Sequence, residues 1–367
     1  MTDDELARLR RDCPNALTHH PRVTMRAAFA QLADDTPEDL DFDTYGTGAW
    51  LAAFEARIAA ELGKEAAVFM PTGTLAQVIA LRIWCDRVGH PTVAFHPTCH
   101  LEIWESRGYA MLHGLRALLV GAPSRLMTLR DFEAVTGPLA ALLVELPQRE
   151  IGAQLPPWDD LVALCDAARA RGARVHLDGA RLWEAMPYYD RSLAEIAALF
   201  DSAYVSFYKG LGGLAGAMLA GDADFIAEAR VWQHRHGGRP ITIAPYAIAA
   251  ERGFERQLPK MRAYRDRAVE IAAALQTLDG VDVVPTPPQT NTFHVFLRGS
   301  AADIEARAHA YAARTGTFVF ARLAPTVVPS VQKWEFVVGD ATMALDVDDV
   351  VRAIRATMTA EARISIA

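Results

Sequence analysis

The rest of the chain can be interpreted from one stretch of its sequence, Ser206-Phe207-Tyr208-Lys209-Gly210-Leu211-Gly212-Gly213. It places one lysine between an apolar, strand-like run and a cluster of glycines. A lysine buried at the end of a strand loses solvation, so its pKa falls and its free amine becomes a nucleophile toward carbonyls. Because lysine before glycine is also common at ordinary turns, the meaning of Lys209 depends on the residues that the fold brings to it.

The composition describes a globular protein with a large core. The chain has 367 residues, of which 51% are hydrophobic and 22% charged, and this length predicts two domains. A net charge of -8 without a basic stripe argues against a nucleic-acid partner. No apolar run is long enough for a membrane, and the acidic N-terminus lacks an apolar signal core. The scattered cysteines (Cys13, Cys85, Cys99 and Cys165) form no CxxC pair, so we expect a cytoplasmic protein.

Short apolar strands alternate with helical stretches over much of the chain. The expected strands are residues 66–70, 93–95, 142–146, 175–177, 204–207 and 217–219, and the expected helices are residues 50–62, 75–84, 158–171 and 192–200. This alternation predicts an α/β fold, with a mostly parallel sheet covered by helices on both faces. We expect an N-terminal segment at residues 1–40, a large domain at 41–240 and a small α+β domain at 241–367.

Four features fall near the ends of the expected strands, where open α/β sheets bind ligands. Thr72-Gly73-Thr74 begins a helix, whose free N–H groups and macrodipole favour an anion. Asp178 follows one strand directly, and Lys209 follows another 31 residues later, about one strand–helix–strand unit. This spacing can bring the two side chains to neighbouring strand ends. The fourth feature is His100, with Glu105 five residues on.

Each feature taken alone has a more frequent structural explanation. The threonines can cap a helix, Asp178 can pair with Arg181, and a lone histidine is usually structural or exposed. Taken together, they supply what pyridoxal phosphate requires: a lysine for its Schiff base, an acid for its ring nitrogen and a phosphate site. The combination is therefore much more specific than any one of its members.

The chain resembles the threonine aldolase and β-eliminating lyase family of fold-type I pyridoxal-phosphate-dependent enzymes over roughly residues 40–240. The matching residues, in family order, are Tyr45-Gly46, Leu62 to Ala67, Pro71-Thr72-Gly73-Thr74, His100 with Glu105, His176-Leu177-Asp178-Gly179-Ala180-Arg181-Leu182-Trp183, Lys209-Gly210-Leu211-Gly212 and Gly237-Gly238. The DGAR and KGLG segments are the most specific of them. The C-terminal third is similar to the family only in its element order.

The resemblance implies a role for each matching residue. Lys209 would hold the cofactor covalently, Asp178 would pair with the ring nitrogen, and His100 would stack on the ring. Arg181 would lie by the phenolic oxygen of the ring or by the substrate carboxylate. Gly73-Thr74 would bind the phosphate.

The resemblance also implies a homotetramer or homodimer with active sites shared between subunits. Tyr45 and the Gly237-Gly238 loop could then serve a neighbouring subunit's site. Tyr208 stands where the family usually has serine or threonine. The sequence leaves open whether this phenol is a catalytic group, a substrate contact or simply bulk.

Three departures from the family concern the substrate. Threonine aldolases share a Glu-Asn-Thr-His-Asn stretch where this chain has residues 145–150, and a histidine where it has Val135-Thr136-Gly137. The family's C-terminal arginine, which clamps the substrate carboxylate, is also missing, and lysine does not replace its bidentate fork. We therefore hypothesise that Arg149 or Lys333 supplies the cation, or that the substrate differs from threonine.

The expected reaction is retro-aldol cleavage of a threonine-like β-hydroxy-α-amino acid to glycine and an aldehyde, with Lys209, His100 and Asp178 as catalytic residues. The alternative is β-elimination on another amino acid.

An NAD-dependent dehydrogenase is disfavoured, because Gly210 to Ala215 matches GxGxxG/A but lies deep in the chain. A catalytically inactive cofactor-binding protein would not need to keep the lysine, the acid and the phosphate loop. No metal site is expected, because neither HExxH nor a paired CxxC is present.

Overall fold

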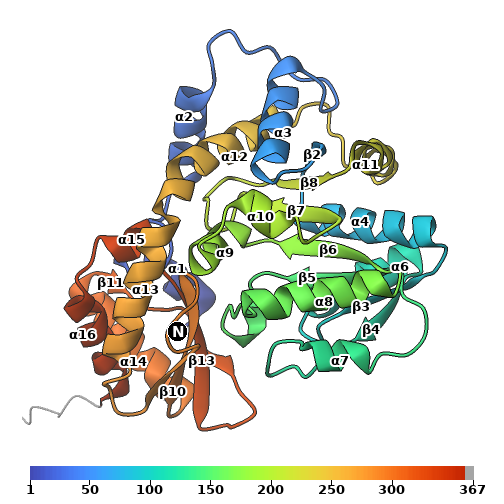
Figure 1. Cartoon of the computed structure of the whole chain (residues 1–367). Coiled ribbons are helices and arrows are strands. Elements are labelled where there is room, and N and C mark those ends of the chain that lie inside the picture. Colours follow the sequence, from blue (N-terminus) through green and yellow to red (C-terminus); the bar gives the residue numbers. More distant parts are fainter. Residues whose placement is uncertain (360–367) are drawn as a thin grey trace, which may run out of the picture. The chain divides into compact units, whose positions relative to one another are not determined.

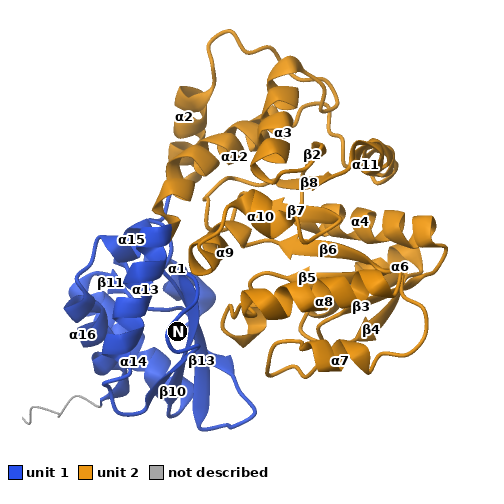
Figure 2. Ribbon diagram, viewed as in Figure 1, with its two compact units in different colours: residues 1–23, 262–367 blue, residues 24–261 orange. Residues whose placement is uncertain are grey.

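The computed structural model describes residues 1–359, which divide into two compact units (Figure 1, Figure 2). The larger unit comprises residues 24–261. The smaller unit comprises residues 1–23 together with the described residues from 262 onward. Residues 1–23 and residues 262–359 therefore form the smaller unit together.

These bounds differ from the divisions expected at residues 40 and 240, and local contacts explain why. Strand β1 (Asn15–Ala16) pairs in parallel with β11 (Thr317–Phe318), which joins the N-terminal residues to the smaller unit. Helix α12 (Ala244–Gln257) packs on α2 (Met25–Asp35) and α3 (Ala49–Glu61), which keeps all three helices in the larger unit.

The larger unit is built on a seven-stranded sheet. Its strand order is β2 (Ala66–Met70), β8 (Ala217–Gly221), β7 (Ser202–Ser206), β6 (Arg174–Gly179), β5 (Ala141–Glu145), β3 (Thr92–Phe95) and β4 (Arg116–Leu119). Strands β7, β6, β5, β3 and β4 run parallel, while β8 is antiparallel to β2 and β7. The predicted mostly parallel sheet is confirmed. The sequence prediction missed β4, although Ala117-Leu118-Leu119 is apolar; the strand lies at the edge of the sheet, and none of its residues is fully buried.

Helices cover this sheet. They are α4 (Gly73–Val88), α5 (His100–Ile103), α6 (Gly108–His113), α7 (Leu129–Glu133), α8 (Trp158–Ala170), α9 (Leu182–Tyr189), α10 (Leu193–Ala197) and α11 (Ala223–Arg235), with the 3₁₀ turns η1 (Arg149–Ile151) and η2 (Leu258–Lys260). All residues of β7 and β8 are buried, as expected for strands that are covered on both faces. In the core, Trp84 of α4 stacks on Phe225 of α11 at 4.6 Å between ring centroids. Burial of such a side chain is worth about 1.5–3 kcal/mol.

The smaller unit has the expected α+β composition. Its antiparallel sheet has the order β12 (Ala324–Pro325), β13 (Val331–Val337), β10 (Thr292–Arg298) and β9 (Val281–Val284). Its helices are α1 (Asp3–Asp12), α14 (Ala301–Thr315), α15 (Asp340–Met343) and α16 (Val347–Met358), and α13 (Met261–Leu275) begins at the boundary. Within residues 1–359, we find no helix with the length and apolar character needed to cross a membrane.

Candidate active site

The carboxyl ends of three parallel strands bring the first site residues together. In the sheet register, Asp178 of β6 lies opposite Glu145 of β5 on one side and Tyr204 of β7 on the other. Lys209 follows β7 after a short connection. The prediction that Asp178 and Lys209 lie at neighbouring strand ends is therefore confirmed.

A pocket opens at this edge of the sheet. It is lined by Thr74, Gln77, His100, Glu105, Glu145, Asp178, Ala180, Arg181, Tyr204, Tyr208 and Lys209. Five of the six residues predicted to bind the cofactor thus line one pocket, from segments far apart in the chain: Thr74, His100, Asp178, Arg181 and Lys209. The lining combines cationic, anionic and hydroxyl groups, which is the composition of a reactive site rather than of a packing defect.

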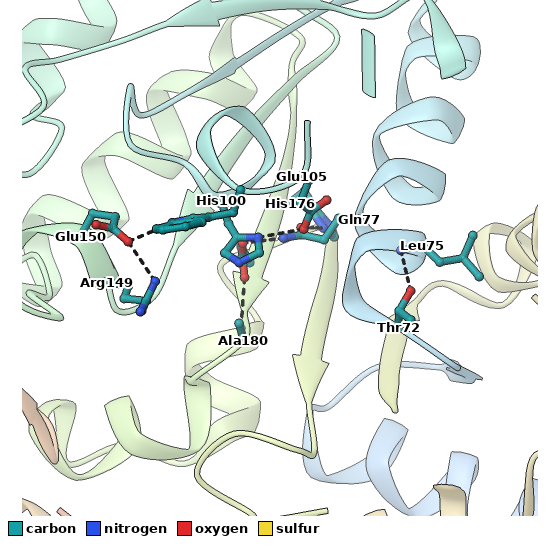
Figure 3. A network of polar contacts seen from close by, with 11 residues as sticks. Thr72, Leu75, Gln77, His100, Glu105, Arg149, Glu150, His176 and Ala180 are labelled. Atoms are coloured by element: carbon teal, nitrogen blue, oxygen red, sulfur yellow. Dashed lines mark hydrogen bonds and ion pairs between the residues drawn. The ribbon is translucent and has the colours of Figure 1, made fainter. Parts of the chain in front are cut away.

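Helix α4 begins at this pocket. The Thr72 hydroxyl accepts the Leu75 N–H at 3.2 Å and caps the helix (Figure 3). Residue 73 must be glycine, because an added Cβ would lie 2.0 Å from the Tyr204 hydroxyl oxygen. The N–H groups of Gly73 and Thr74, in the first turn, point out of the helix and make this end attractive to an anion.

Lys209 sits in a tight turn after β7. Its carbonyl accepts the Gly212 N–H at 3.1 Å, and the Phe207 carbonyl accepts the Gly213 N–H at 2.8 Å. Burial, together with the nearby Arg181 charge, lowers the pKa of Lys209 from 10.5 to about 8, although Asp178, Glu145 and Glu184 oppose this shift. At pH 7, about a tenth of the molecules then carry a free amine at Lys209, far more than at an ordinary lysine, and the free amine is the nucleophilic form.

A chain of hydrogen bonds orients Asp178, and Figure 3 labels three residues of this chain, Gln77, His176 and Ala180. Its carboxylate accepts from the Gln77 amide and from the Ala180 N–H at 3.1 Å. The Gln77 oxygen contacts His176 Nε2 at 3.1 Å, and His176 Nδ1 contacts the Ser202 hydroxyl at 2.7 Å. Burial lowers the pKa of His176 to about 3, so this imidazole is neutral and donates through Nε2. The network holds Asp178 in one orientation toward the pocket.

Two further carboxyl groups lie near Lys209: the half-buried Glu145 and the buried Glu184. Glu145 accepts from the Gln148 amide at 2.8 Å and from the Arg149 N–H at 3.2 Å. Burial and the neighbouring Asp178 raise the pKa of Glu145, and burial raises the pKa of Asp178 as well. Glu184 lies against the turn that follows Lys209, and burial raises its pKa too. The site therefore holds more carboxyl groups than cations, and some of them keep their protons.

His100 and Glu105 form a pair at the pocket wall. His100 Nδ1 lies 2.9 Å from Glu105 Oε1, so the carboxylate fixes the orientation of the ring (Figure 3). The other carboxylate oxygen of Glu105 is buried and has no hydrogen-bond partner among residues 1–359. Arg181, at the start of α9, completes the cationic part of the lining.

The remaining predicted residues lie outside this lining. The Arg149 guanidinium pairs with Glu150 at 2.9 Å and lies 5.9 Å above the Trp104 ring (Figure 3). Tyr45 donates its N–H to the Ile241 carbonyl at 2.9 Å, next to the Gly237-Gly238 loop. Lys333 lies on β13 in the smaller unit.

Sequence reasoning gave no role to several residues that build the site. These are Gln77, Glu145, His176, Glu184, Tyr204 and Ser206. Two weak signals existed: Gln77 is polar within an apolar helical run, and His176 shares a strand face with Asp178. The others reach the site through register and close approach, which spacing alone does not reveal.

The residues of the pocket match the groups that pyridoxal phosphate requires. It offers an amine with a lowered pKa, a buried acid on a neighbouring strand and a helix N-terminus without space for a side chain at Gly73. Next to the Tyr204 and Tyr208 phenols, the buried Ser206 hydroxyl adds a further polar group to this part of the site.

Comparison with known proteins agrees with this fit. The profile of the β-eliminating lyase family matches residues 20–300. A solved structure from Listeria monocytogenes EGD-E, provisionally described as an L-allo-threonine aldolase, is 39% identical with a TM-score of 0.92, covering 96% of this chain and 99% of that one. A protein of Exiguobacterium sp. 255-15, provisionally described as an aromatic amino acid β-eliminating lyase/threonine aldolase, is 40% identical with a TM-score of 0.91 and the same coverage.

Proteins named as threonine aldolases are also similar. Low-specificity L-threonine aldolase 1 of Arabidopsis thaliana is 26% identical over 263 residues, which is 69% of this chain and 73% of the plant enzyme. These similarities extend over both compact units. They argue against the alternative of an NAD-dependent dehydrogenase. The chain therefore belongs to the β-eliminating lyase family and is a pyridoxal-phosphate-dependent lyase of the threonine aldolase type.

Proposed function

We propose that this enzyme cleaves a threonine-like β-hydroxy-α-amino acid to glycine and an aldehyde by a retro-aldol reaction. The observation that carries the proposal is the convergence of Lys209, Asp178 and the His100–Glu105 pair in one pocket. The likeness to proteins described as threonine aldolases supports it. Pyridoxal phosphate supplies the electron sink for the electron pair released at the substrate Cα.

Each site residue has a proposed task. Lys209 would hold the cofactor covalently through its side-chain amine. Asp178 holds a proton at the pyridine nitrogen, and Gln77 and the Ala180 N–H keep its carboxylate aimed there. His100, oriented by Glu105, stacks on the ring and takes the β-hydroxyl proton.

The substrate carboxylate decides which bond is broken, because that bond must stand perpendicular to the ring. Of the three candidate cations, Arg181 lines the pocket, whereas Arg149 and Lys333 lie outside its lining. We propose that one of these three positions the carboxylate.

A reduction experiment tests the cofactor anchor. Purified protein should be yellow, and borohydride should bleach it and add the mass of the reduced cofactor to the peptide that contains Lys209. A product assay then tests the reaction with L-threonine and L-allo-threonine. Aldehyde released in equal amount to glycine supports aldol cleavage, whereas keto acid released with ammonia and no glycine would reject it.

β-Elimination is the second candidate. The likeness to the Exiguobacterium protein, described provisionally as both kinds of lyase, favours it. Aromatic amino acids and serine are the substrates to test, with release of pyruvate and ammonia as the supporting result. A protein that binds the cofactor but acts on none of these substrates would support the inactive alternative.

We also propose a homotetramer or homodimer in the cytoplasm. The side chains of Phe42, Tyr45 and Ile241 are exposed, with Phe42 at 88%, and Tyr45 contacts the chain at Ile241. Such an apolar surface suits a neighbouring subunit. Light scattering on the purified protein would measure the subunit number, and a monomer at all concentrations would reject the proposal.

A further inference from the structure

The N-terminus of α4 is more than a capped helix start. The Thr72 hydroxyl takes the Leu75 N–H, and the Thr72 carbonyl takes the Ala76 N–H at 3.3 Å. Gly73 and Thr74 therefore present their own N–H groups to the pocket, and α4 is 16 residues long, enough for a full macrodipole. A helix end alone does not define a ligand. The side chains that face it determine which anion can bind there.

Tyr204 brings a hydroxyl directly to this helix end. A Cβ on Gly73 would lie 2.0 Å from the Tyr204 oxygen and 2.4 Å from its Cζ, so the phenol lies against the first turn of α4. Tyr204 is only 3% exposed, yet it lines the same pocket as Thr74. Burial and the nearby Asp178 raise the pKa of Tyr204, so its hydroxyl keeps its proton and can donate.

A second hydroxyl lies beside it. Ser206 is two residues further along β7, so its side chain is on the same face as that of Tyr204. It lies close enough to the Tyr204 and Tyr208 phenols to lower the pKa of each. Ser206 is 1% exposed, and its hydroxyl oxygen is a buried atom without a hydrogen-bond partner in residues 1–359. The groups that can pair with this hydroxyl are the neighbouring Tyr204 and Tyr208 phenols and a ligand that is not part of the chain.

We infer that Tyr204 is a ligand of the cofactor phosphate, donating its phenolic hydrogen to a phosphate oxygen beside the N–H groups of Gly73 and Thr74. Ser206, on the same face of β7, provides a second hydroxyl to this phosphate site. A phosphate dianion accepts several short hydrogen bonds, and donors fixed on a strand and a helix end cost little entropy to align. This inference rests on the proposed phosphate role of Gly73-Thr74.

The chemistry of the cofactor provides the test. Pyridoxal has the same ring as pyridoxal phosphate but no phosphate, so the ratio of the two dissociation constants measures the phosphate site alone. We would titrate apoprotein of the wild type and of Tyr204→Phe with each compound, following visible absorbance and protein fluorescence. Loss of one hydrogen bond to a charged group predicts a roughly ten- to hundredfold weaker affinity for pyridoxal phosphate. The affinity for pyridoxal should be unchanged.

Two further variants keep the test decisive. Ser206→Ala should also weaken the affinity for pyridoxal phosphate relative to that for pyridoxal, but less than Tyr204→Phe does. Tyr109→Phe is the matched control, since it removes another buried tyrosine hydroxyl, one that donates to Glu102 outside the pocket. It should leave both affinities intact.

Three results would overturn the inference. Equal weakening of both compounds by Tyr204→Phe would show that the hydroxyl acts on the ring or on packing. No change in either affinity would show that it makes no contact. Wild-type apoprotein that binds pyridoxal and pyridoxal phosphate equally well would show that no phosphate site exists here, while leaving the covalent anchor at Lys209 intact.

Discussion

The side-chain amide of Gln77 on helix α4 donates a hydrogen bond to the Asp178 carboxylate at the end of β6. The same amide accepts from neutral His176, so its orientation is determined from both sides. The hydrogen bond stabilises the charged form of a carboxyl group whose pKa burial raises. Gln77 therefore helps keep Asp178 ionised and able to hold a proton on the cofactor.

Replacing Gln77 by leucine should impair catalysis without preventing folding. The pKa of Asp178 should rise further, and kcat should fall by about tenfold or more, since a hydrogen bond to a charged group is worth about 1.5–3 kcal/mol. The measurement is kcat and the visible spectrum of the holoenzyme as functions of pH. Gln276→Leu, which removes an exposed amide bonded to Thr286, is the control. An unchanged pH profile in Gln77→Leu would contradict this role.

Gly73→Ala should weaken cofactor binding. The added methyl group would overlap the Tyr204 hydroxyl and Cζ, so the phenol or the helix end must move. We expect the affinity for pyridoxal phosphate to fall by about tenfold or more if one hydrogen bond to the phosphate is lost. Gly108→Ala is a close control, because Gly108 also begins a helix but has open space around its Cβ. Equal affinities for pyridoxal phosphate in the two variants would contradict the close contact between residue 73 and the Tyr204 phenol.

Lys209 should influence the stability of the apoprotein at alkaline pH. Its pKa is about 8 when folded and 10.5 in the reference state, so between these values the unfolded chain binds more protons. The free energy of unfolding contributed by Lys209 therefore increases as pH rises from about 8 to 10, by up to about 1.4 kcal/mol per pH unit. Urea titrations of wild-type apoprotein and Lys209→Met should show this slope only in the wild type. Identical slopes would mean that the amine is not desolvated.

Arg149 allows a test of substrate binding. If its guanidinium positions the substrate carboxylate, Arg149→Ala should raise KM by about tenfold or more and leave cofactor affinity unchanged. Arg191→Ala is a matched control, because Arg191 likewise pairs with a glutamate and lies over a tryptophan ring. An unchanged KM in Arg149→Ala would eliminate Arg149 and leave Arg181 and Lys333 to be compared in the same way.

The sequence alone predicted the fold class and the centre of the site. Continuous apolar strands alternating with helices indicated a mostly parallel sheet, and the spacing of Asp178 and Lys209 placed them on neighbouring strands. These features are encoded locally, in runs of a few residues and in the lengths between them. For that reason the sequence could predict that the lysine, the acid, the histidine and the helix start meet at one pocket.

The tertiary structure decided which groups surround that centre. Gln77 and Asp178 are 101 residues apart in the chain, and only the packing of α4 on the sheet brings them together. The strand register sets Glu145 and Tyr204 beside Asp178, and a shift by one residue would turn them to the other face. Burial then sets the protonation of these groups, because the pKa of a carboxyl or an amine depends on the solvent it loses on folding. The chain itself determines which reactive groups are present, and the fold determines their neighbours and their charge.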